Sequence, residues 1–341
     1  MTDHVSAPVA GRRFLQTLVD GDAIEEVYLV VDKQLRANRN GNLFIQLELR
    51  DRTGSMAARL WNAGEPLFRS FDTGDFLLVK GKVQLFQGAL QMILHHLARV
   101  PRERVDLAEF LPHTTQDVSK LYERLRTHLR KLGNPHLRAL AETFLMDEAF
   151  TQALCRAPAG VRNHHAYIGG LLEHVVTMLD AADRLAPLYP DLDRDLFLMG
   201  VFLHDLGKVV ELSYDRAFAY TDEGQLVGHL VIGVEMITAR VPQACQLTGQ
   251  PFPTELLLRL KHIVLSHHGT HEFGSPRLPM TPEAIAIHHL DNLDAKLHTF
   301  TRDIREDTGT SAWTQFNQAL QRRLFKGGGG QAVDGDGDDE E

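Results

Sequence analysis

The sequence predicts a multidomain fold in which an N-terminal all-β barrel is followed by an all-α domain. Residues 22–100 alternate between apolar and polar side chains, with turn-forming residues between the alternating runs. From Gln116 onward the apolar residues recur at helical spacing, and no further alternating run follows. With 341 residues the chain is long enough for several domains.

The N-terminal region is expected to form five strands, with a short helix before the fourth. The clearest alternation is in Leu43–Arg50, where Ile45 and Leu47 lie on one side and Phe44 and Gln46 on the other. The expected elements are the strands Val27–Lys33, Leu43–Arg50, Ser55–Trp61, Asp75–Phe86 and Ala89–Val100, and the helix Ala63–Phe71. This order is that of an OB-fold, a small barrel that commonly binds oligonucleotides.

Breaks in these patterns divide the chain into expected segments. A glycine run followed by acidic residues predicts a disordered tail at the C-terminal end. The segments are an N-terminal extension (1–21), the OB-fold domain (22–100), a linker (101–115), a helical connector (116–160), a second helical domain (161–326) and the tail (327–341).

Bulk properties exclude several classes of protein. No run approaches the roughly 18 to 20 apolar residues that a membrane span needs, and the N-terminus has no signal-peptide pattern. The two cysteines, Cys155 and Cys245, form no CxxC pair, so we expect no disulfide framework and a cytoplasmic location. The formal net charge is −9, but the acidic tail supplies much of it, so nucleic-acid binding stays open.

The strongest functional signal is a set of histidines and aspartates on helical segments. The set is His174 in Gly170–Leu185, His204 and Asp205 at the end of Asp195–Leu206, His229 at the start of Gly228–Val241, His267 and His268 at the end of Thr254–Ser266, and Asp291 in Pro282–Phe300. Imidazole and carboxylate ligands suit Mn, Fe, Zn or Mg-like ions. Adjacent His204 and Asp205 can reach one centre, and a carboxylate can bridge two ions.

Taken singly, each of these residues has a simpler explanation. A histidine on an apolar helix is more often a hydrogen-bonded core residue, and a His-His-Gly sequence suits a helix C-terminus. The ordered set would rarely arise by chance, and it favours a metal site. Asp294 shares a helix face with Asp291 and is a candidate to orient a ligand, whereas His262 is explained equally well as a core residue. Surface, packing or substrate contacts are expected for His164, His165, His271, His288, His289 and His298.

The set resembles the signature of the HD superfamily of metal phosphohydrolases, which is His…His-Asp…Asp. That signature maps onto His174, His204-Asp205 and Asp291. The additional His229 and His267-His268 resemble the second-metal ligands of HD proteins with two or three metals, such as the HD-GYP group. The GYP-type sequence itself is absent, because GTHEFGSP follows His268.

An OB-fold followed by an HD domain resembles the YhaM-type 3′–5′ exoribonucleases. The motifs that carry this resemblance are NHHAYIGGLLEH (163–174), HDLGK (204–208), Gly228-His229, SHHGTHEFGSP (266–276) and DNLDAK (291–296). The resemblance implies degradation of single-stranded RNA from the 3′ end, with single-stranded DNA as a further candidate substrate. It also implies divalent metal ions, with Mn²⁺ preferred over Fe, Mg, Co or Zn.

On this basis we expect two metal ions. The first is assigned to His174, His204, Asp205 and Asp291, and Asp205 is expected to reach the second, assigned to His229, His267 and His268. Asp205 and Lys208 are the expected catalytic residues, with Lys208 neutralising phosphate charge near the metals. The alternative for Lys208 is a solvated lysine after a helix-ending glycine.

Cations interleaved with aromatic residues predict a single-strand binding face on the barrel, because bases stack on rings while cations neutralise the backbone. The candidates are Phe44, Arg59, Trp61, Lys80, Lys82 and Phe86. The alternative is that these rings cap the barrel or pack on the helical domain. Rival functions are a phosphodiesterase acting on a cyclic dinucleotide and a regulatory RNA-binding protein with an inactive metal site. A homo-oligomer is compatible with the sequence.

Overall fold

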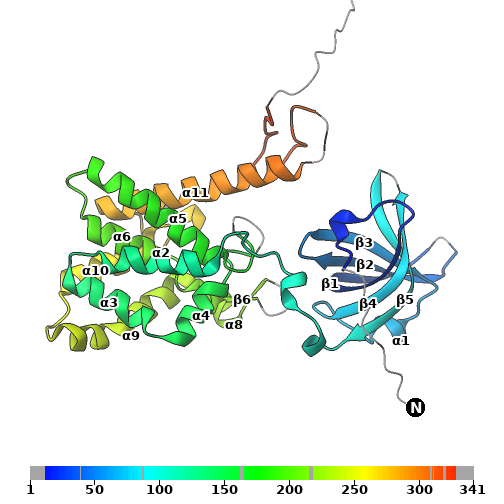
Figure 1. Cartoon of the computed structure of the whole chain (residues 1–341), viewed down its shortest axis with the longest axis horizontal. Helices are drawn as coiled ribbons and strands as arrows, with labels where there is room; N and C mark the ends of the chain where they lie inside the picture. Colours follow the sequence, from blue (N-terminus) through cyan, green and yellow to red (C-terminus); the bar gives the residue numbers. More distant parts are fainter. Residues whose placement is uncertain are drawn as a thin grey trace, which may run out of the picture.

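The structure is a computed structural model of the chain (Figure 1). It describes residues 12–38, 40–86, 88–161, 165–214, 218–307, 309, 311–317 and 320–327. Residues 1–11 of the expected extension and 328–341 of the expected tail therefore lie outside the described residues, as do Asn163 and His164 of the first motif.

The N-terminal domain is a closed barrel of five strands, as the alternating runs predict. Its elements are η1 (Leu15–Thr17), β1 (Ala23–Ala37), β2 (Leu43–Asp51), β3 (Gly54–Trp61), α1 (Glu65–Phe68), β4 (Phe76–Phe86) and β5 (Ala89–Val100). The strand order is β1-β2-β3-β5-β4, in which β3 and β5 pair in parallel and the other neighbouring strands, including β1 and β4, pair antiparallel. The short helix α1 lies between the third and fourth strands, which confirms the OB-fold.

Burial along β2 follows the predicted alternation. Ile45, Leu47 and Leu49 fill the barrel interior together with apolar residues of the other strands. Phe44 is also buried, although it lies on the other side of the strand. The ring of Trp61, on the paired strand β3, lies 4.8 Å from the Phe44 ring and covers it.

The segment between the two domains packs on both of them. It contains the short helices η2 (Arg102–Arg104) and η3 (Leu107–Glu109). Phe110 and Leu111 are buried against Phe76 of the barrel, and Ile168 and Phe218 of the helical domain pack on the same cluster. The barrel and the helical domain therefore lie side by side with this segment between them (Figure 1).

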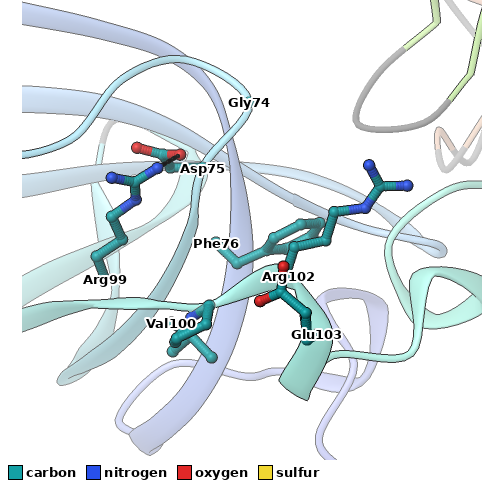
Figure 2. A pocket seen from close by; sticks show the side chains of 8 residues that line it. Gly74, Asp75, Phe76, Arg99, Val100, Arg102 and Glu103 are labelled. Atoms are coloured by element: carbon teal, nitrogen blue, oxygen red, sulfur yellow. Dashed lines mark ion pairs between the residues drawn. The ribbon is translucent and has the colours of Figure 1, made fainter.

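A pocket opens where the barrel passes into this segment (Figure 2). Arg99 lines it and forms an ion pair with Asp75, with Nη2 2.9 Å from Oδ1. Phe76 lies on the other side and contacts the ring of Phe110 edge-on at 4.7 Å. The Arg99 guanidinium at this pocket is therefore already compensated by a carboxylate.

The second domain is helical. Its elements are α2 (Val118–Arg130), α3 (Pro135–Leu145), α4 (Glu148–Arg156), α5 (Gly170–Leu185), η4 (Ala186–Leu188), α6 (Arg194–Leu203), α7 (Lys208–Glu211), β6 (Leu212–Ser213), β7 (Ala219–Tyr220), α8 (Asp222–Leu226), α9 (His229–Thr248), α10 (Thr254–Ser266), η5 (His271–Phe273) and α11 (Pro282–Glu306). Helix α6 lies at the centre of this domain, since it is buried from Leu196 to Leu203 and packs against α5, α10 and α11. Within the described residues, no helix has the length and apolar character needed to cross a lipid bilayer.

Two helices run further than the sequence predicts. Helix α9 continues through Pro242 to Thr248, although a proline lacks the amide hydrogen and normally ends or kinks a helix. Buried Ala244 after the proline keeps the last turns packed on the core. Helix α11 continues from the expected end at Phe300 to Glu306, and its distal part extends away from the helical domain (Figure 1).

Candidate metal centre

The seven predicted metal ligands come from distant parts of the chain and meet in one place. His174 lies within α5, and His204 is the residue at which the buried helix α6 ends, so Asp205 follows directly into the interior. His229 begins α9 and His267 ends α10. A side chain at Gly207 would lie 2.1 Å from the carbonyl oxygen of His229, so this glycine allows the two segments to approach.

Asp205 lies between two groups of imidazoles. Its Oδ2 is 3.5 Å from Nε2 of His204 and 3.8 Å from Nε2 of His174. Its Oδ1 is 3.5 Å from Nε2 of His229 and 3.5 Å from Nε2 of His267. One carboxylate oxygen therefore faces each group, which is the geometry that a bridging ligand requires.

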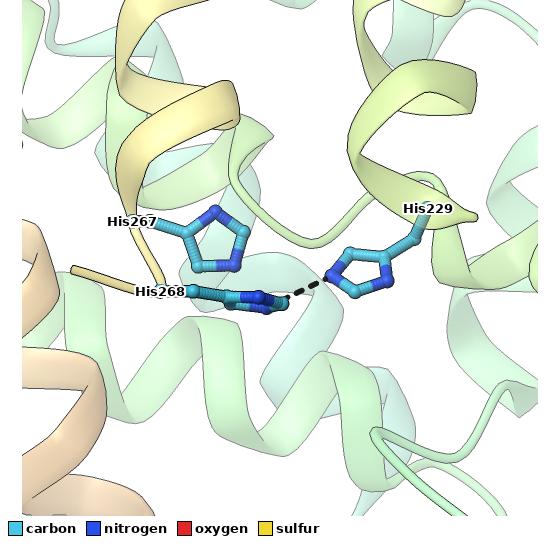
Figure 3. A group of neighbouring side chains, drawn as sticks. All are labelled: His229, His267 and His268. Carbon is cyan, nitrogen blue, oxygen red and sulfur yellow. Dashed lines mark hydrogen bonds between the residues drawn. The ribbon is translucent and has the colours of Figure 1, made fainter. Parts of the chain in front are cut away.

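The remaining two candidates complete these groups. Asp291 Oδ1 lies 3.4 Å from Nε2 of His174, whose Nε2 is also 3.3 Å from Nε2 of His204. Figure 3 shows the second group, in which the Nε2 atoms of His229 and His268 are 3.2 Å apart. Ligand atoms of His229, His267 and His268 lie within 4.8 Å of one another, as do those of His174, His204 and Asp205.

Hydrogen bonds orient four of the five imidazoles. In each case Nδ1 donates to an acceptor outside the group, which leaves Nε2 pointing inward. The acceptors are Asp294 Oδ2 for His174 (2.7 Å), the Val201 carbonyl for His204 (2.7 Å), Glu211 Oε1 for His229 (2.8 Å) and the Val264 carbonyl for His267 (2.9 Å). Buried Asp205 Oδ1 and His268 Nδ1 have no hydrogen-bond partner within the described residues. Inward Nε2 atoms and a buried, unsatisfied carboxylate oxygen fit divalent cations.

Electrostatics keep both carboxylates ionised. Burial raises the pKa of Asp205, but the charges of Lys208 and His204 outweigh burial and hold that pKa well below its usual range. Burial also raises the pKa of Asp291, and hydrogen bonding and charge from His174 more than reverse it. Burial alone would lower the pKa of His174, but Asp291 and Asp294 raise it to about 10. For His267, burial dominates and lowers the pKa to about 4.

Lys208 lies inside the site. Its Nζ is 2.7 Å from Asp205 Oδ2, and its side chain is largely buried. Burial lowers its pKa, but the attraction of Asp205 outweighs burial and raises the pKa above the usual value. A freely solvated lysine, the alternative considered from the sequence, does not fit this geometry.

The predicted binding residues of the barrel fall into two groups. Phe44, Arg59, Trp61 and Phe86 are in contact, since the Arg59 guanidinium lies 6.0 Å from the Trp61 ring and 5.6 Å from the Phe86 ring. Lys82 is exposed nearby: Arg59 on β3 and Lys82 on β4 both pair with Ile93 of β5. Lys80 is instead paired with Glu25 at 2.6 Å, so its charge is partly compensated.

Comparisons with known proteins agree with this architecture. The HD domain family matches residues 171–296, and the OB-fold nucleic acid binding domain family matches residues 29–99. The 3′-5′ exoribonuclease YhaM of Bacillus subtilis (strain 168) is 34% identical over 306 residues, which cover 89% of this chain and 95% of that protein. The protein of the same name from Geobacillus sp. (strain WCH70) is 34% identical over 303 residues, which cover 88% and 90%. This chain belongs to the YhaM family.

The family assignment confirms the resemblance seen in the motifs. For a YhaM-family chain, the HD domain implies divalent metal binding, and the His–Asp group is where such ions could bind. Among solved structures, the second OB-fold domain of replication protein A from Methanococcus maripaludis aligns with 26% of this chain at 22% identity and a TM-score of 0.22. A similarity that low supports no conclusion about function.

Two residues of this YhaM-family site were not singled out by the sequence. Glu211 accepts hydrogen bonds from both the backbone amide and Nδ1 of His229. His165, expected in surface, packing or substrate contacts, is buried and donates to Asp294 at 3.0 Å. The only available signal was the position of His165 inside the NHHAYIGG motif. His262 lies outside the group, where its Nε2 accepts from the Met280 amide at 2.9 Å.

Proposed function

We propose that this chain is a metal-dependent 3′–5′ exoribonuclease that degrades single-stranded RNA to 5′-mononucleotides. Its YhaM relatives carry the name 3′-5′ exoribonuclease. The chain has an OB-fold domain followed by an HD domain, which is the order that the sequence predicts. The observation that carries the proposal is the carboxylate of Asp205, whose two oxygens face two separate groups of imidazoles.

The proposed centre holds two divalent ions, and Mn²⁺ is our first choice because mixed imidazole and carboxylate ligands suit it. One ion is assigned to His174, His204, Asp205 and Asp291, and the other to Asp205, His229, His267 and His268. Bound there, divalent ions would supply Lewis acidity at the phosphate ester and activate water for attack.

The chain's own residues prepare the site for this chemistry. Asp294, Glu211 and two backbone carbonyls hold the imidazoles with Nε2 inward, so the ligands need no rearrangement when an ion binds. Lys208 holds Asp205 by a buried ion pair. The role we propose for Lys208 is therefore to fix and charge-balance Asp205, in addition to attracting the phosphate.

On the barrel, the exposed faces of Trp61 and Phe86 with Arg59 between them suit a single strand of nucleic acid. Bases can stack on the rings regardless of sequence, and Arg59 and Lys82 can neutralise the backbone. We propose that this face retains the RNA while its 3′ end is at the metals.

The test uses purified protein, Mn²⁺ and single-stranded RNA labelled at either the 5′ or the 3′ end. We expect 3′-labelled RNA to release labelled mononucleotide immediately, whereas 5′-labelled RNA shortens gradually. Loss of the 5′ label as mononucleotide first would contradict the polarity. A DNA strand of the same sequence shows whether the 2′-hydroxyl is required. Hydrolysis of a cyclic dinucleotide with no attack on RNA would establish the rival phosphodiesterase instead.

A further inference from the structure

His165 is buried and joined to the proposed metal centre through one carboxylate oxygen. Its side chain is 4% exposed, and its Nε2 lies 3.0 Å from Oδ2 of Asp294. The same oxygen accepts from Nδ1 of His174 at 2.7 Å. Asp294 Oδ2 therefore lies between an imidazole that points to the metals and one that does not.

The hydrogen bonds continue from Asp294 through His165 to Tyr167. The hydroxyl of Tyr167 lies 2.7 Å from Nδ1 of His165. Burial raises the pKa of Tyr167, as do the charge and hydrogen bond of Glu173, so its hydroxyl keeps the proton. The Asp294 carboxylate can only accept hydrogen bonds, so His165 donates to it from Nε2 and His174 donates to it from Nδ1. Nε2 of His174 is left facing the proposed metal position, where it can bind an ion after losing its proton.

The backbone holds His165 in a conformation that few residues adopt. Its φ is +50°, in the left-handed region. Its carbonyl oxygen accepts from the Ala159 amide at 3.1 Å, and a side chain at Gly170 would lie 2.1 Å from this oxygen. Gly169 has φ +80°, in the left-handed region that favours glycine. The Gly169-Gly170 pair thus allows the turn that places His165 beside Asp294.

The same turn is attached to the segment that joins the two domains. The Ile168 amide donates to the Pro112 carbonyl at 2.8 Å, and the Thr114 amide donates to the Ile168 carbonyl at 2.9 Å. Ile168 also packs on the cluster around Phe110. The turn is therefore fixed on both sides, by α5 and by the connection to the barrel. Strain held by surrounding structure in this way is common at functional sites.

We propose that His165 is a positioning residue of the metal centre, which fixes Asp294 so that Asp294 can fix the orientation and tautomer of His174. The inference rests on the proposed metal-dependent function but concerns a residue that is not itself a ligand. With His174 as its one donor, the Asp294 carboxylate could rotate about the Cβ–Cγ bond. A second donor, His165, on the same oxygen restricts that rotation. His165 acts on the ion only through Asp294 and His174.

The experiment measures Mn²⁺ affinity by isothermal titration of the full-length protein. H165A is expected to weaken one of the Mn²⁺ sites by about tenfold, the lower end of what an orienting residue contributes. H165Q keeps a side-chain N–H that can donate to Asp294, so it should recover most of the affinity. H289A is the matched control, because His289 is exposed on the same helix as Asp294, and it should bind Mn²⁺ like the wild type.

A double-variant cycle tests whether His165 acts through Asp294. If it does, H165A/D294A binds Mn²⁺ no more weakly than D294A alone, because the second change removes nothing further. Additive losses would overturn the proposal, as would wild-type affinity in H165A. Thermal unfolding of the metal-free variants excludes a merely structural role: H165A and H165Q should have similar unfolding temperatures while their Mn²⁺ affinities differ. Equal affinities in these two variants would also overturn the proposal.

These measurements separate this inference from the proposed function. The titration needs no RNA, so a wild-type protein that binds Mn²⁺ but degrades no RNA would refute the exoribonuclease proposal and leave the role of His165 to be decided by the affinities. A wild-type protein that binds no divalent ion at all would overturn both.

Discussion

In the barrel, the side chains proposed to bind RNA lie on the outer surface, whereas in the helical domain the proposed metal ligands lie in the core. Trp61 and Phe86 are 41% and 45% exposed, while His174 and His204 are completely buried. The barrel interior is filled by other residues and does not need Trp61 or Phe86. The core of the helical domain, in contrast, includes the site, so changes to the ligands should affect stability as well as activity.

The largest expected effect of this difference is at Asp205. D205A should abolish RNA hydrolysis, because each oxygen of the Asp205 carboxylate faces a different imidazole group and both would lose this ligand. It should also lower the free energy of unfolding of the metal-free protein by about 3 kcal/mol, since it leaves the buried Lys208 cation without its partner. Urea denaturation and the labelled-RNA assay measure the two effects.

D205A/K208M is the matched control for that result. Removing both charges should restore most of the stability, because no unpaired buried charge is left, while hydrolysis stays absent. Turnover by D205A in the presence of metal would contradict the assignment of Asp205. A D205A protein as stable as the wild type would contradict the claim that the site is part of the core.

Metal removal should lower the unfolding temperature of the helical domain and leave that of the barrel unchanged. An ion that binds only the folded state at 100 times its dissociation constant adds about 2.7 kcal/mol to the free energy of unfolding. Scanning calorimetry with Mn²⁺ and with chelator should therefore show a higher unfolding temperature with metal. If the domains unfold separately, only the transition of the helical domain should move. A shift confined to the barrel would place the ions elsewhere.

The pH dependence follows from His174, whose pKa of about 10 in the metal-free site must be overcome when an ion binds. Because the ligand must lose its proton, Mn²⁺ affinity should rise up to about tenfold per pH unit between pH 7 and 9. Titrations in buffers of different ionisation enthalpy should show about one proton released per protein. Affinity that is flat over this range would contradict a protonated His174.

In the metal-free protein, the raised pKa of His174 makes stability fall as pH rises, which is opposite to the trend in metal affinity. The folded-state pKa of His174 lies above the ordinary histidine value, so its contribution is fully present below about pH 6.5 and is lost as pH rises through about 10. Chelator-treated protein should therefore lose stability over the range in which metal binding improves. A variant lacking Asp294 should show a smaller loss, because Asp294 is one of the groups that raises this pKa.

Local patterns predicted the fold well where one period dominates. The alternation in β2 and the helical spacing of α5 and α10 give elements whose bounds agree with the structure to within one residue. Helix α9 was predicted to end before Pro242, because local propensity cannot register the packing of Ala244 that maintains it. The additional short strands β6 and β7 are two residues each, too short for any periodic signal.

The candidate site also has residues that the sequence predicts and residues that it does not. Its ligands stand out because His-Asp and His-His pairs at helix ends form a recognisable order. Their partners do not, because the contacts depend on the tertiary structure: His165 and Asp294 are separated by 129 positions in the sequence. The placement of His165 also needs a left-handed backbone and two adjacent glycines, which no helical or strand periodicity encodes.

The smallest expected effect is on the barrel, where it tests whether the exposed aromatic side chains bind RNA. W61A removes a half-exposed ring next to Arg59, so it should raise the KM for long single-stranded RNA by roughly tenfold, within the about 1–3 kcal/mol that a stacked base contributes. The kcat and the hydrolysis of a small phosphodiester should stay unchanged, because the proposed metal centre lies in the other domain.

The second tryptophan of the chain is the matched control. Trp313 is 49% exposed but follows α11 rather than lying on the barrel, so W313A should alter neither KM nor kcat. If both variants weaken RNA retention equally, the effect belongs to exposed aromatic surface in general and the barrel face has no special role. If W61A also lowers the stability of the metal-free protein by several kcal/mol, Trp61 belongs to the barrel core after all. The contrast between a surface used for binding and a core used for catalysis would then fail.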